Sequence, residues 1–351
     1  MIRSKFFDSV GIVGFGAYVP RFRLKVSEVA EVWGKEGKEI ESSLGVRQKA
    51  VADLDEDCVT MGVEAGRIAI ERAGIKPQKI GAVFVGSESH PYAVNPSGTV
   101  VAKALGVGRE YFCVDLTFAC KAGTAGMQIV AAMIEAGMID YGLVVGSDKA
   151  QGRPGDILDF TAGAGAAAFV LGRKKKEFLA RLRATYSFSS DTVDFWRRQG
   201  EKYPSHAGRF TGEPGYFYHV ESCSKNFLKT IKMKPRDFDY AVFHMPNAKF
   251  PRKVAASLGF RPDQLETGWV VEEIGNSYAS SSLLGLCLVL EKAPREQTIF
   301  MTSYGSGAGS DSFYFKTTKL LKKIKGNLLR EKFRDTQKIS YGQYLRKNEA
   351  I

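Results

Sequence analysis

Cysteine and histidine are both scarce in this chain, and neither is arranged in a metal-binding motif. The five cysteines are odd in number and scattered, and none is spaced C-x-x-C: Cys58, Cys113, Cys120, Cys223 and Cys287. This pattern argues against a disulfide framework and a cysteine-based zinc site, and it fits reduced thiols. The four histidines form no H-E-x-x-H motif, so no bound metal is expected.

Long apolar runs are absent as well. No segment approaches the roughly 20 apolar residues of a membrane-spanning helix, so we expect no membrane association. No secretory signal is visible at residues 1–5, and we therefore expect a cytoplasmic location. With 351 residues, 44% of them hydrophobic and 25% charged, the chain should be globular and long enough for two halves that each bury a core.

Acidic residues are few near the end of the chain. The formal net charge is +12, and residues 316–351 contain eleven Lys or Arg against three Asp or Glu. We interpret residues 319–351 as a basic extension that is either solvated or bound to a partner. Aromatic residues are sparse there before Tyr341 and Tyr344, so a platform for stacking nucleic-acid bases is not predicted.

Cys120 is the first candidate catalytic residue. The apolar run at 111–114 predicts a strand, and the small and apolar residues at 127–134 predict a buried helix. Cys120 would then lie at a strand-to-helix turn, where the amides and dipole of the helix N-terminus favour a thiolate. A thiolate is the nucleophile that acyl transfer needs. The alternative is a buried structural cysteine, the commoner role of a lone one.

The first half of the chain alternates predicted strands and helices. Strands are predicted where apolar runs occur, at residues 10–18, 80–86, 142–146 and 163–171. Helices are predicted at 26–32 and at 60–73, with Gly74 as a cap and a polar stretch between them. Glu88 follows the strand at 80–86 and is therefore a candidate base. Its alternative role is a solvated carboxylate or a helix cap.

The second half repeats this order. The run at 240–243 echoes 81–84 and ends in His244, the small-residue segment at 275–285 echoes the Cys120 stretch, and the strands at 299–303 and 312–315 complete the series. We infer an internal duplication, with halves at 1–175 and 176–318 followed by the extension at 319–351. Two such α/β halves place ligands at the carboxyl ends of their strands. Glu88, Cys120, His244 and Asn276 could then face one cleft.

Several longer motifs occur in the same order as in one known family. They lie at residues 86–94, 115–126, 209–214, 244–251, 275–280 and 304–307. With these motifs the chain resembles the archaeal type of hydroxymethylglutaryl-CoA synthase, a family of condensing enzymes in the thiolase superfamily. The resemblance covers about residues 10–318. It implies a thiolase-like fold, in which two duplicated α/β halves form a layered α-β-α-β-α sandwich.

The resemblance also implies a reaction and its catalytic residues. Cys120 matches the nucleophile that takes an acetyl group from acetyl-CoA. Glu88 matches the carboxylate that removes a proton from the acetyl methyl group and later returns one, and burial would raise its pKa as such a base requires. His244 matches the histidine that polarises the ketone of acetoacetyl-CoA. Water then releases 3-hydroxy-3-methylglutaryl-CoA, a step of the mevalonate pathway that leads to isoprenoids.

Further residues match binding positions of the family. Asn276 and Ser306 match residues that hold the second substrate, and Thr161 and Thr211 match threonines that contact substrate. Lys249, Lys253 and Arg209 match coenzyme A contacts, in which a cation meets the carrier's phosphates. For the lysines the alternative is an ordinary solvated helix face. No cofactor is expected, because the coenzyme A thioesters are substrates that already activate both carbons.

Two other functions remain open from the sequence. A ketoacyl synthase of the chain-initiating type also uses Cys, His and Asn in this order, although it does not need Glu88. A non-catalytic basic scaffold on the same fold would use the extension instead, and we expect no nucleic-acid partner. The family resemblance implies a homodimer. It also implies a complex with acetoacetyl-CoA thiolase through a small scaffold protein with a zinc ribbon and an OB-like domain.

Overall fold

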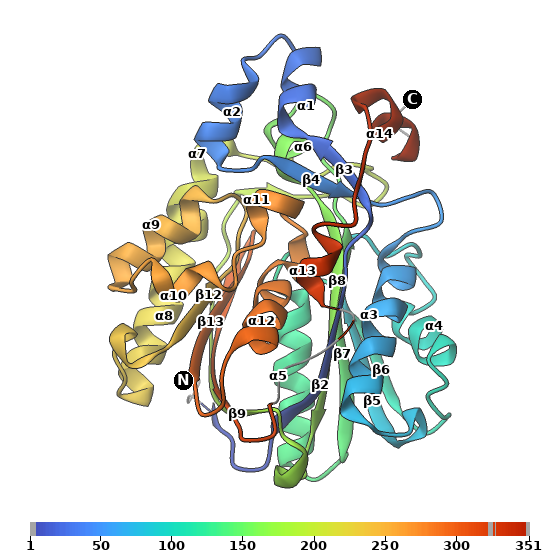
Figure 1. The fold of residues 1–351 in the computed structure, drawn as a ribbon, viewed down its shortest axis with the longest axis vertical. Coiled ribbons are helices and arrows are strands. Elements are labelled where there is room, and N and C mark those ends of the chain that lie inside the picture. The colour runs from blue at the N-terminus through green and yellow to red at the C-terminus, as the bar shows by residue number, and fades with distance from the viewer. Residues whose placement is uncertain (1–4, 322–325, 327, 349–351) are drawn as a thin grey trace.

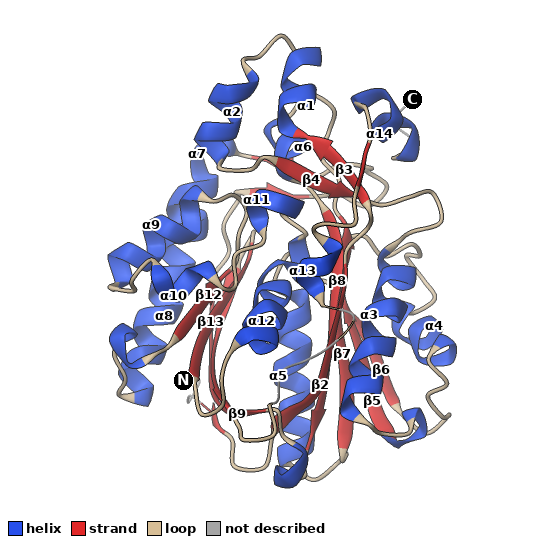
Figure 2. Ribbon diagram, in the orientation of Figure 1, coloured by secondary structure: helices blue, strands red, loops and turns tan. Residues whose placement is uncertain are grey.

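One ten-stranded sheet runs through the centre of the molecule (Figures 1 and 2). A computed structural model describes residues 5–321, 326 and 328–348. Along the sheet the strands are β12 (Tyr240–Phe243), β13 (Thr298–Gly305), β14 (Gly309–Thr317), β9 (Ala180–Ser189), β2 (Gly11–Tyr18), β8 (Ala164–Gly172), β7 (Tyr141–Lys149), β5 (Ile80–Gly86) and β6 (Phe112–Leu116), and β1 (Lys5–Phe6) pairs with β9.

The sheet has the same pairing pattern on both sides of its middle. Moving outward from β2, the strands are β8, β7 and β5, and moving outward from β9 they are β14, β13 and β12. In each series the first two pairs are antiparallel and the last pair is parallel. The two arms join where β2 and β9 pair, at Gly11 with Arg181 and at Ile12 with Ala180. This order matches the repeat seen in the sequence, while the half boundaries stay predictions.

Helices form three layers around the two arms of the sheet, which confirms the predicted α-β-α-β-α architecture (Figure 1). The middle layer contains α5 (Ala122–Glu135) and α12 (Ser281–Lys292), whose apolar side chains share one core with strands of both arms. The outer face of the first arm is covered by α3 (Cys58–Ala73) and α4 (Ser97–Ala104). The outer face of the second arm is covered by α8 (Phe217–Ile231), α9 (Lys249–Leu258) and α10 (Asp263–Glu266). No described helix is long and apolar enough to cross a bilayer.

Glycines on β2 allow α3 to pack closely on the sheet. A Cβ on Gly14 would lie 2.1 Å from the backbone oxygen of Ala69, and one on Gly16 would lie 2.1 Å from that of Ala65. These glycines therefore have a packing role. Helix α3 begins two residues before its predicted start, because the Asp57 side chain accepts from the backbone N–H groups of the first turn.

The polar stretch between the first two predicted helices contains structure that the sequence analysis missed. It forms α2 (Gly37–Leu44) and β4 (Gln48–Val51) after the predicted α1 (Val26–Val32). A second sheet has the order β15-β3-β4, with β3 (Phe22–Lys25) in its middle and β15 (Gln337–Lys338) from the C-terminal extension. Helix α2 is short and mostly polar, and Ile40 and Leu44, one turn apart, pack against the core; this amphipathic spacing was a signal that the sequence analysis did not use.

The described part of the extension folds back onto the first half of the chain. It contains α13 (Leu329–Lys332), β15 and α14 (Tyr341–Lys347), which lies near α1 (Figure 1). Tyr341 donates to Asp159 Oδ2 at 2.5 Å, and Lys49 lies over the Tyr344 ring at 4.0 Å. Both tyrosines are buried, so a solvated extension was the wrong interpretation here. Lys322, Lys323 and Lys325 of the predicted basic extension lie outside the described residues.

A buried ion pair lies beneath α14. Lys49 on β4 pairs with Asp159 at 3.2 Å, and both side chains are buried. Burial lowers the pKa of Lys49 to about 8, although Asp159 opposes that shift. Asp159 belongs to α6 (Ile157–Thr161), the helix that ends in Thr161. The extension therefore packs against the segment that carries a candidate substrate-binding residue.

The remaining elements are short. They are α7 (Gly208–Phe210), α11 (Val271–Ile274), β10 (Phe195–Trp196), β11 (Ser205–His206), η1 (Pro77–Lys79), η2 (Lys175–Glu177), η3 (Thr211–Tyr216), η4 (Pro235–Asp237) and η5 (Tyr278–Ser280). Several of them lie around the candidate site.

Candidate active site

Cys120 and Glu88 are in direct contact. Glu88 follows β5, and Cys120 lies between β6 and α5, at the strand-to-helix turn that the sequence predicts. Ala119 has a φ of +42°, a left-handed conformation that turns the chain before Cys120. The Cys120 Sγ–H donates to Glu88 Oε1 at 3.1 Å. The structure therefore brings a thiol and a carboxylate to one point from two neighbouring strands.

The pKa of Cys120 is shifted in the direction opposite to the sequence-based expectation. Burial raises it well above its usual value, and the negative charge of Glu88 raises it further. Cys120 precedes Lys121, the N-cap of α5, and therefore lies outside the helix. Desolvation and the adjacent carboxylate outweigh the helix dipole. The resting group is a thiol that donates its proton toward Glu88.

The pKa of Glu88 is raised to about 8, as expected for a base of this kind. The first cause is burial, and the second is the negative charge of Asp148. The hydrogen bond from Cys120 opposes the shift without reversing it. Glu88 is partly accessible at the surface, yet the protein atoms packed around it replace most of its water. It is therefore balanced between its acid and base forms near neutral pH.

Asp148 holds the Glu88 loop in place, and the sequence analysis missed it. Its side chain is fully buried at the end of β7. Oδ1 accepts from the backbone N–H of Glu88 at 2.8 Å and from that of Ser89 at 3.0 Å. Oδ2 accepts from the backbone N–H of Ala279 in η5 at 2.8 Å. The position of Asp148 close to the end of a strand, near the loop position that Glu88 takes after β5, was the available signal.

We expect Asp148→Asn to slow the reaction by roughly 10- to 100-fold, because an amide presents one oxygen where the carboxylate presents two. Hydrogen bonds to a buried charge are worth about 1.5–3 kcal/mol. The substitution also removes the negative charge beside Glu88, so the apparent pKa of Glu88 should fall. The measurement is the pH dependence of kcat/KM. An unchanged pH profile in the folded variant would contradict the role given to Asp148.

His244 follows β12 and is almost completely buried. Burial lowers its pKa to about 3, so its imidazole is neutral at physiological pH and can donate from one ring nitrogen. Its backbone N–H donates to the Thr302 oxygen at 2.9 Å, and Tyr216 donates to its backbone oxygen at 2.7 Å. Within the described residues, Nδ1 has no hydrogen-bond partner. A fixed neutral histidine with a free ring nitrogen suits the polarisation of a carbonyl.

Asn276 and Thr161 meet beside the Cys120 region. The Asn276 N–H donates to the Thr161 oxygen at 2.7 Å, and its Oδ1 accepts from the Tyr278 N–H at 3.1 Å. Tyr278 packs with Cys120 and Ala162 in one small buried cluster. The pKa of the Tyr278 phenol is raised by burial first and then by the negative charge of Glu88. Tyr278 is therefore a central residue of the site that sequence reasoning did not single out.

Ser306 and Thr211 occupy two further edges of this region. Ser306 follows β13 and lines a cavity of about 510 Å³ together with Phe118 and Ala119 of the Cys120 loop. Thr211 lies in η3, the segment that also carries Tyr216 beneath His244. The Thr211 hydroxyl is buried and has no partner among the described atoms.

The residues predicted to contact coenzyme A lie on the surface of the protein. Lys249 and Lys253 are exposed and four residues apart on α9, so they share one helix face. Lys253 Nζ lies 4.7 Å from the centre of the Phe217 ring. Arg209 is exposed on α7. Their exposure is equally compatible with an ordinary solvated surface, so their binding role stays a prediction.

A small hairpin of β10 and β11 covers Glu88. Arg197, which follows β10, donates to the Glu88 backbone oxygen at 2.8 Å. The Phe195 ring meets the Tyr278 ring edge-on, with 6.3 Å between centroids. The space that Glu88, Tyr278 and Arg197 share with neighbouring residues is only about 20 Å³, which is room for about one water molecule. The hairpin therefore shields the carboxylate from bulk solvent.

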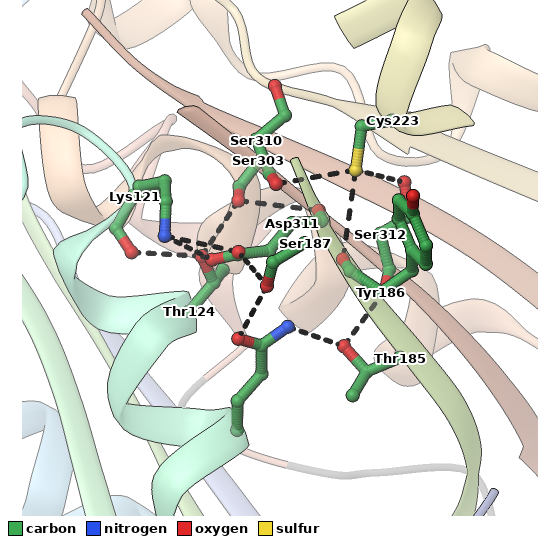
Figure 3. Close-up of polar contacts among 11 residues, drawn as sticks. Lys121, Thr124, Thr185, Tyr186, Ser187, Cys223, Ser303, Ser310, Asp311 and Ser312 are labelled. Atoms are coloured by element: carbon green, nitrogen blue, oxygen red, sulfur yellow. Dashed lines mark hydrogen bonds and ion pairs between the residues drawn. The ribbon is translucent and has the colours of Figure 1, made fainter. Parts of the chain in front are cut away.

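A buried polar network fixes the Cys120 loop to the second half of the chain (Figure 3). Lys121 Nζ lies 3.1 and 3.0 Å from the two carboxylate oxygens of Asp311 on β14. Asp311 also accepts from Thr124 at 2.9 Å and from Ser187 at 2.8 Å. Both charged side chains are buried, so the pair ties the residue next to Cys120 to the opposite arm of the sheet.

We expect Asp311→Asn to destabilise the protein by about 3–5 kcal/mol, because it leaves the charge of Lys121 buried without its partner. The double variant Lys121→Met/Asp311→Asn should recover most of this loss, since it buries no charge. The measurement is the free energy of unfolding in urea. Equal stability of the single variant and the parent protein would contradict the expectation.

The described residues contain no group of three or more His, Cys, Asp or Glu side chains arranged to hold a metal ion. Among the described residues, no third side chain joins Glu88 and His244 to form a metal-binding group.

Two family models match parts of the chain. Residues 114–187 match the model of 3-oxoacyl-[acyl-carrier-protein (ACP)] synthase III, and residues 228–317 match the model of its C-terminal part. The first match includes Cys120, and the second includes His244 and Asn276. Together the matches cover less than half of the 351 residues.

Curated relatives match over nearly the whole length. A hydroxymethylglutaryl-CoA synthase of Archaeoglobus fulgidus is 53% identical over 97% of this chain and 99% of its own. One of Methanopyrus kandleri is 50% identical over 98% of each chain. Among solved structures, MvaS in complex with 3-hydroxy-3-methylglutaryl coenzyme A has a TM-score of 0.88 at 22% identity, and the match covers 98% of this chain and 92% of that one.

Proposed function

The chain belongs to the hydroxymethylglutaryl-CoA synthase family, and from this we propose that Cys120, Glu88 and His244 divide the chemistry of its reaction. The enzyme condenses acetyl-CoA with acetoacetyl-CoA and water to give 3-hydroxy-3-methylglutaryl-CoA and free CoA, in the mevalonate pathway. The observation that carries the assignment of roles is the contact of 3.1 Å between Cys120 Sγ and Glu88 Oε1.

Acetyl transfer comes first. Glu88 accepts the Cys120 thiol proton along their hydrogen bond, and the sulfur attacks the carbonyl carbon of acetyl-CoA. The carbon–sulfur bond to the carrier breaks, and the departing thiolate takes up the proton as free CoA. This sequence explains how a thiol with a raised pKa can still act, because its base is already in contact.

Condensation follows on the acetylated enzyme. Glu88, again a carboxylate, removes a proton from the methyl group of the acetyl-cysteine, and the resulting carbon attacks the ketone of acetoacetyl-CoA. His244 donates a hydrogen bond to the ketone oxygen and stabilises the alkoxide that forms there. The alkoxide takes up the proton held by Glu88. Water then hydrolyses the thioester to Cys120 and restores the thiol.

The remaining predicted residues position the substrates in this proposal. Asn276 and Ser306 offer an amide and a hydroxyl to the second substrate, and Thr161 and Thr211 offer hydroxyls that contact substrate. Lys249, Lys253 and Arg209 meet the phosphates of coenzyme A. The thioesters supply the activation of both carbons, so the scheme uses no cofactor.

The alternative function, a chain-initiating ketoacyl synthase, is supported by the two family models that match Cys120 and His244. Glu88 distinguishes the two functions, because the chemistry of a ketoacyl synthase gives no role to a carboxylate in contact with the nucleophile. The test is mass spectrometry of products from acetyl-CoA mixed with either acetoacetyl-CoA or malonyl-acyl carrier protein. We expect hydroxymethylglutaryl-CoA from the first mixture. A ketoacyl product from the second mixture alone would reverse the assignment.

His244→Ala is expected to leave acetylation of Cys120 intact while lowering the rate of product formation by about 10²- to 10³-fold, the cost of losing one donor to a developing oxyanion. The measurement combines the mass of the acetylated protein with kcat. His244→Gln keeps a donor and should recover part of the rate. Loss of acetylation in both folded variants would contradict a role confined to the ketone.

We propose that the protein forms a homodimer through its edge strand β6. Phe112 is 52% exposed and Val114 is 38% exposed on this strand, and an uncovered apolar edge favours pairing with another strand. Sedimentation should show a dimer that Val114→Glu dissociates. A monomeric parent protein would contradict the proposed dimer.

The assembly with acetoacetyl-CoA thiolase and a small zinc-ribbon and OB-like scaffold also remains a proposal, and any zinc in it belongs to the scaffold. Co-purification of the three chains tests it. Cys120 must be reduced to act, so we retain the proposal of a cytoplasmic location.

A further inference from the structure

A second cavity lies at the end of the sheet opposite to Cys120. It has a volume of about 710 Å³ and is lined where β9 begins and β14 ends. The other ends of the same two strands carry Ser187 and Asp311 of the network beside Cys120 (Figure 3). The cavity is therefore separated from the candidate active site by the length of the sheet.

The lining of this cavity is strongly basic. Its six cationic residues are Lys175, Lys176, Arg181, Arg183, Lys316 and Lys319, and its one acidic residue is Glu296. Glu296 pairs with Lys316 at 3.7 Å. Four of these cations, Lys175, Lys176, Arg181 and Arg183, form no ion pair within the described residues, so no described carboxylate lies within ion-pair distance of them.

The strand register places like charges opposite one another. Arg181 on β9 faces Lys316 on β14 in an antiparallel pair, where side chains lie about 4.5–5.5 Å apart at Cβ and like charges destabilise. Arg183 lies at the β-bulge beside Tyr314 and Phe315, and a bulge redirects a side chain. Repulsion of this kind is relieved when an anion binds between the cations.

We propose that this cavity binds a compact anion with two or more phosphate groups. The guanidinium groups of Arg181 and Arg183 can each hold phosphate oxygens through two donors, and the lysines add further charge. The volume falls in the range of small-molecule sites. Proteins that bind single-stranded nucleic acid typically stack its bases on several aromatic residues, and Tyr314 is the one aromatic residue of the lining.

The experiment is isothermal titration of the full-length protein with inorganic tripolyphosphate, with orthophosphate and ATP as separate arms at constant ionic strength. We expect saturable one-to-one binding of tripolyphosphate, about tenfold or more tighter than that of orthophosphate. Arg181→Ala/Arg183→Ala should weaken it by about tenfold or more, since charge-assisted hydrogen bonds are lost. Lys175→Ala/Lys176→Ala is a second cavity variant that leaves the sheet unchanged.

Lys103→Ala/Arg109→Ala removes two exposed cations outside the cavity lining and should bind like the parent protein. Equal weakening in that control, or unchanged binding in both cavity variants, would overturn the proposal, as would the absence of saturable binding. Equal affinities for ATP and tripolyphosphate indicate recognition of the phosphates alone, whereas tighter ATP binding that Tyr314→Ala removes indicates a nucleotide.

A final arm separates this site from the coenzyme site. Titration is repeated with coenzyme A present and with Lys249→Ala/Lys253→Ala. We expect tripolyphosphate binding to persist in both cases, because the two lysines on α9 do not line the cavity. Displacement by coenzyme A together with loss of binding in Lys249→Ala/Lys253→Ala would place the anion at the substrate site and refute a second one, without bearing on the roles of Cys120 and Glu88.

Discussion

Cys120→Ala protein mixed with acetyl-CoA is expected to acquire no acetyl group and to lose about 10⁴-fold or more of its activity, as happens when a covalent nucleophile is removed. The cause is that, in the part of the chain that the structure describes, the Cys120 thiol is the nucleophile that hydrogen-bonds to the Glu88 carboxylate. The sulfur lies 3.1 Å from Glu88 Oε1, and the alanine methyl has no lone pair to attack with. Intact-protein mass and the rate of hydroxymethylglutaryl-CoA formation measure the two effects.

Cys113→Ala is the matched control. Cys113 is the nearest cysteine in sequence and is less buried than Cys120, and burial raises its pKa to about 11. This variant should acetylate at Cys120 and turn over at the parent rate. Acetylation of the Cys120→Ala protein at an enzymatic rate, mapped to any other cysteine, would show that the nucleophile has been misassigned.

Glu88→Gln is expected to separate the two halves of the reaction. Condensation should slow by about 10²- to 10⁴-fold, the usual contribution of a general base, while Cys120 still becomes acetylated, at a lower rate. The amide keeps the shape of the carboxylate and removes its charge. Because that charge raises the pKa of Cys120, the thiol of the variant should react with iodoacetamide faster at a given pH.

The pH dependence of the parent protein carries the same information. With the pKa of Glu88 raised to about 8, the fraction of carboxylate, and so the condensation rate, should rise with pH up to about that value. In Glu88→Gln this rise should be absent. A folded variant that retains it, or that condenses at the parent rate, would exclude Glu88 as the base.

The stability of the folded protein should decrease as pH rises, whereas the condensation rate increases. The pKa of Glu88 is raised in the folded protein from 4.5 to about 8, so between these values the unfolded chain releases a proton that the folded protein keeps. Unfolding then becomes more favourable as pH rises. The melting temperature of the parent protein should therefore fall relative to that of Glu88→Gln across this range, which calorimetry at several pH values can measure.

Much of the site could be predicted, because its proposed catalytic residues come shortly after apolar strands. Cys120, Glu88 and His244 follow β6, β5 and β12, whose apolar runs are plain in the sequence. Parallel strands bring their carboxyl ends to one edge. The motif resemblance then supplied candidate roles that the residue types alone left open.

What could not be predicted depends on contacts between distant residues. In the sequence, Asp148 is only a charged residue near the end of a strand, and its hydrogen bonds from the backbone N–H groups of Glu88 and Ala279 are seen only in the structure. The thiolate expected at Cys120 followed from a local rule, whereas burial and the Glu88 charge decide its actual pKa. Tyr341 and Tyr344 lie in a sequence segment with a basic composition, and only their burial shows that the segment folds back.

The packing of α14 also bears on how the protein is made. Lys49 and Asp159 are buried under Tyr341 and Tyr344, about 180 to 300 residues later in a chain of 351. Domains usually fold in order as they leave the ribosome. Here the Lys49–Asp159 pair stays uncovered until residues 341–344 have been made, so the N-terminal half cannot reach its final form before α14 is available to pack on it.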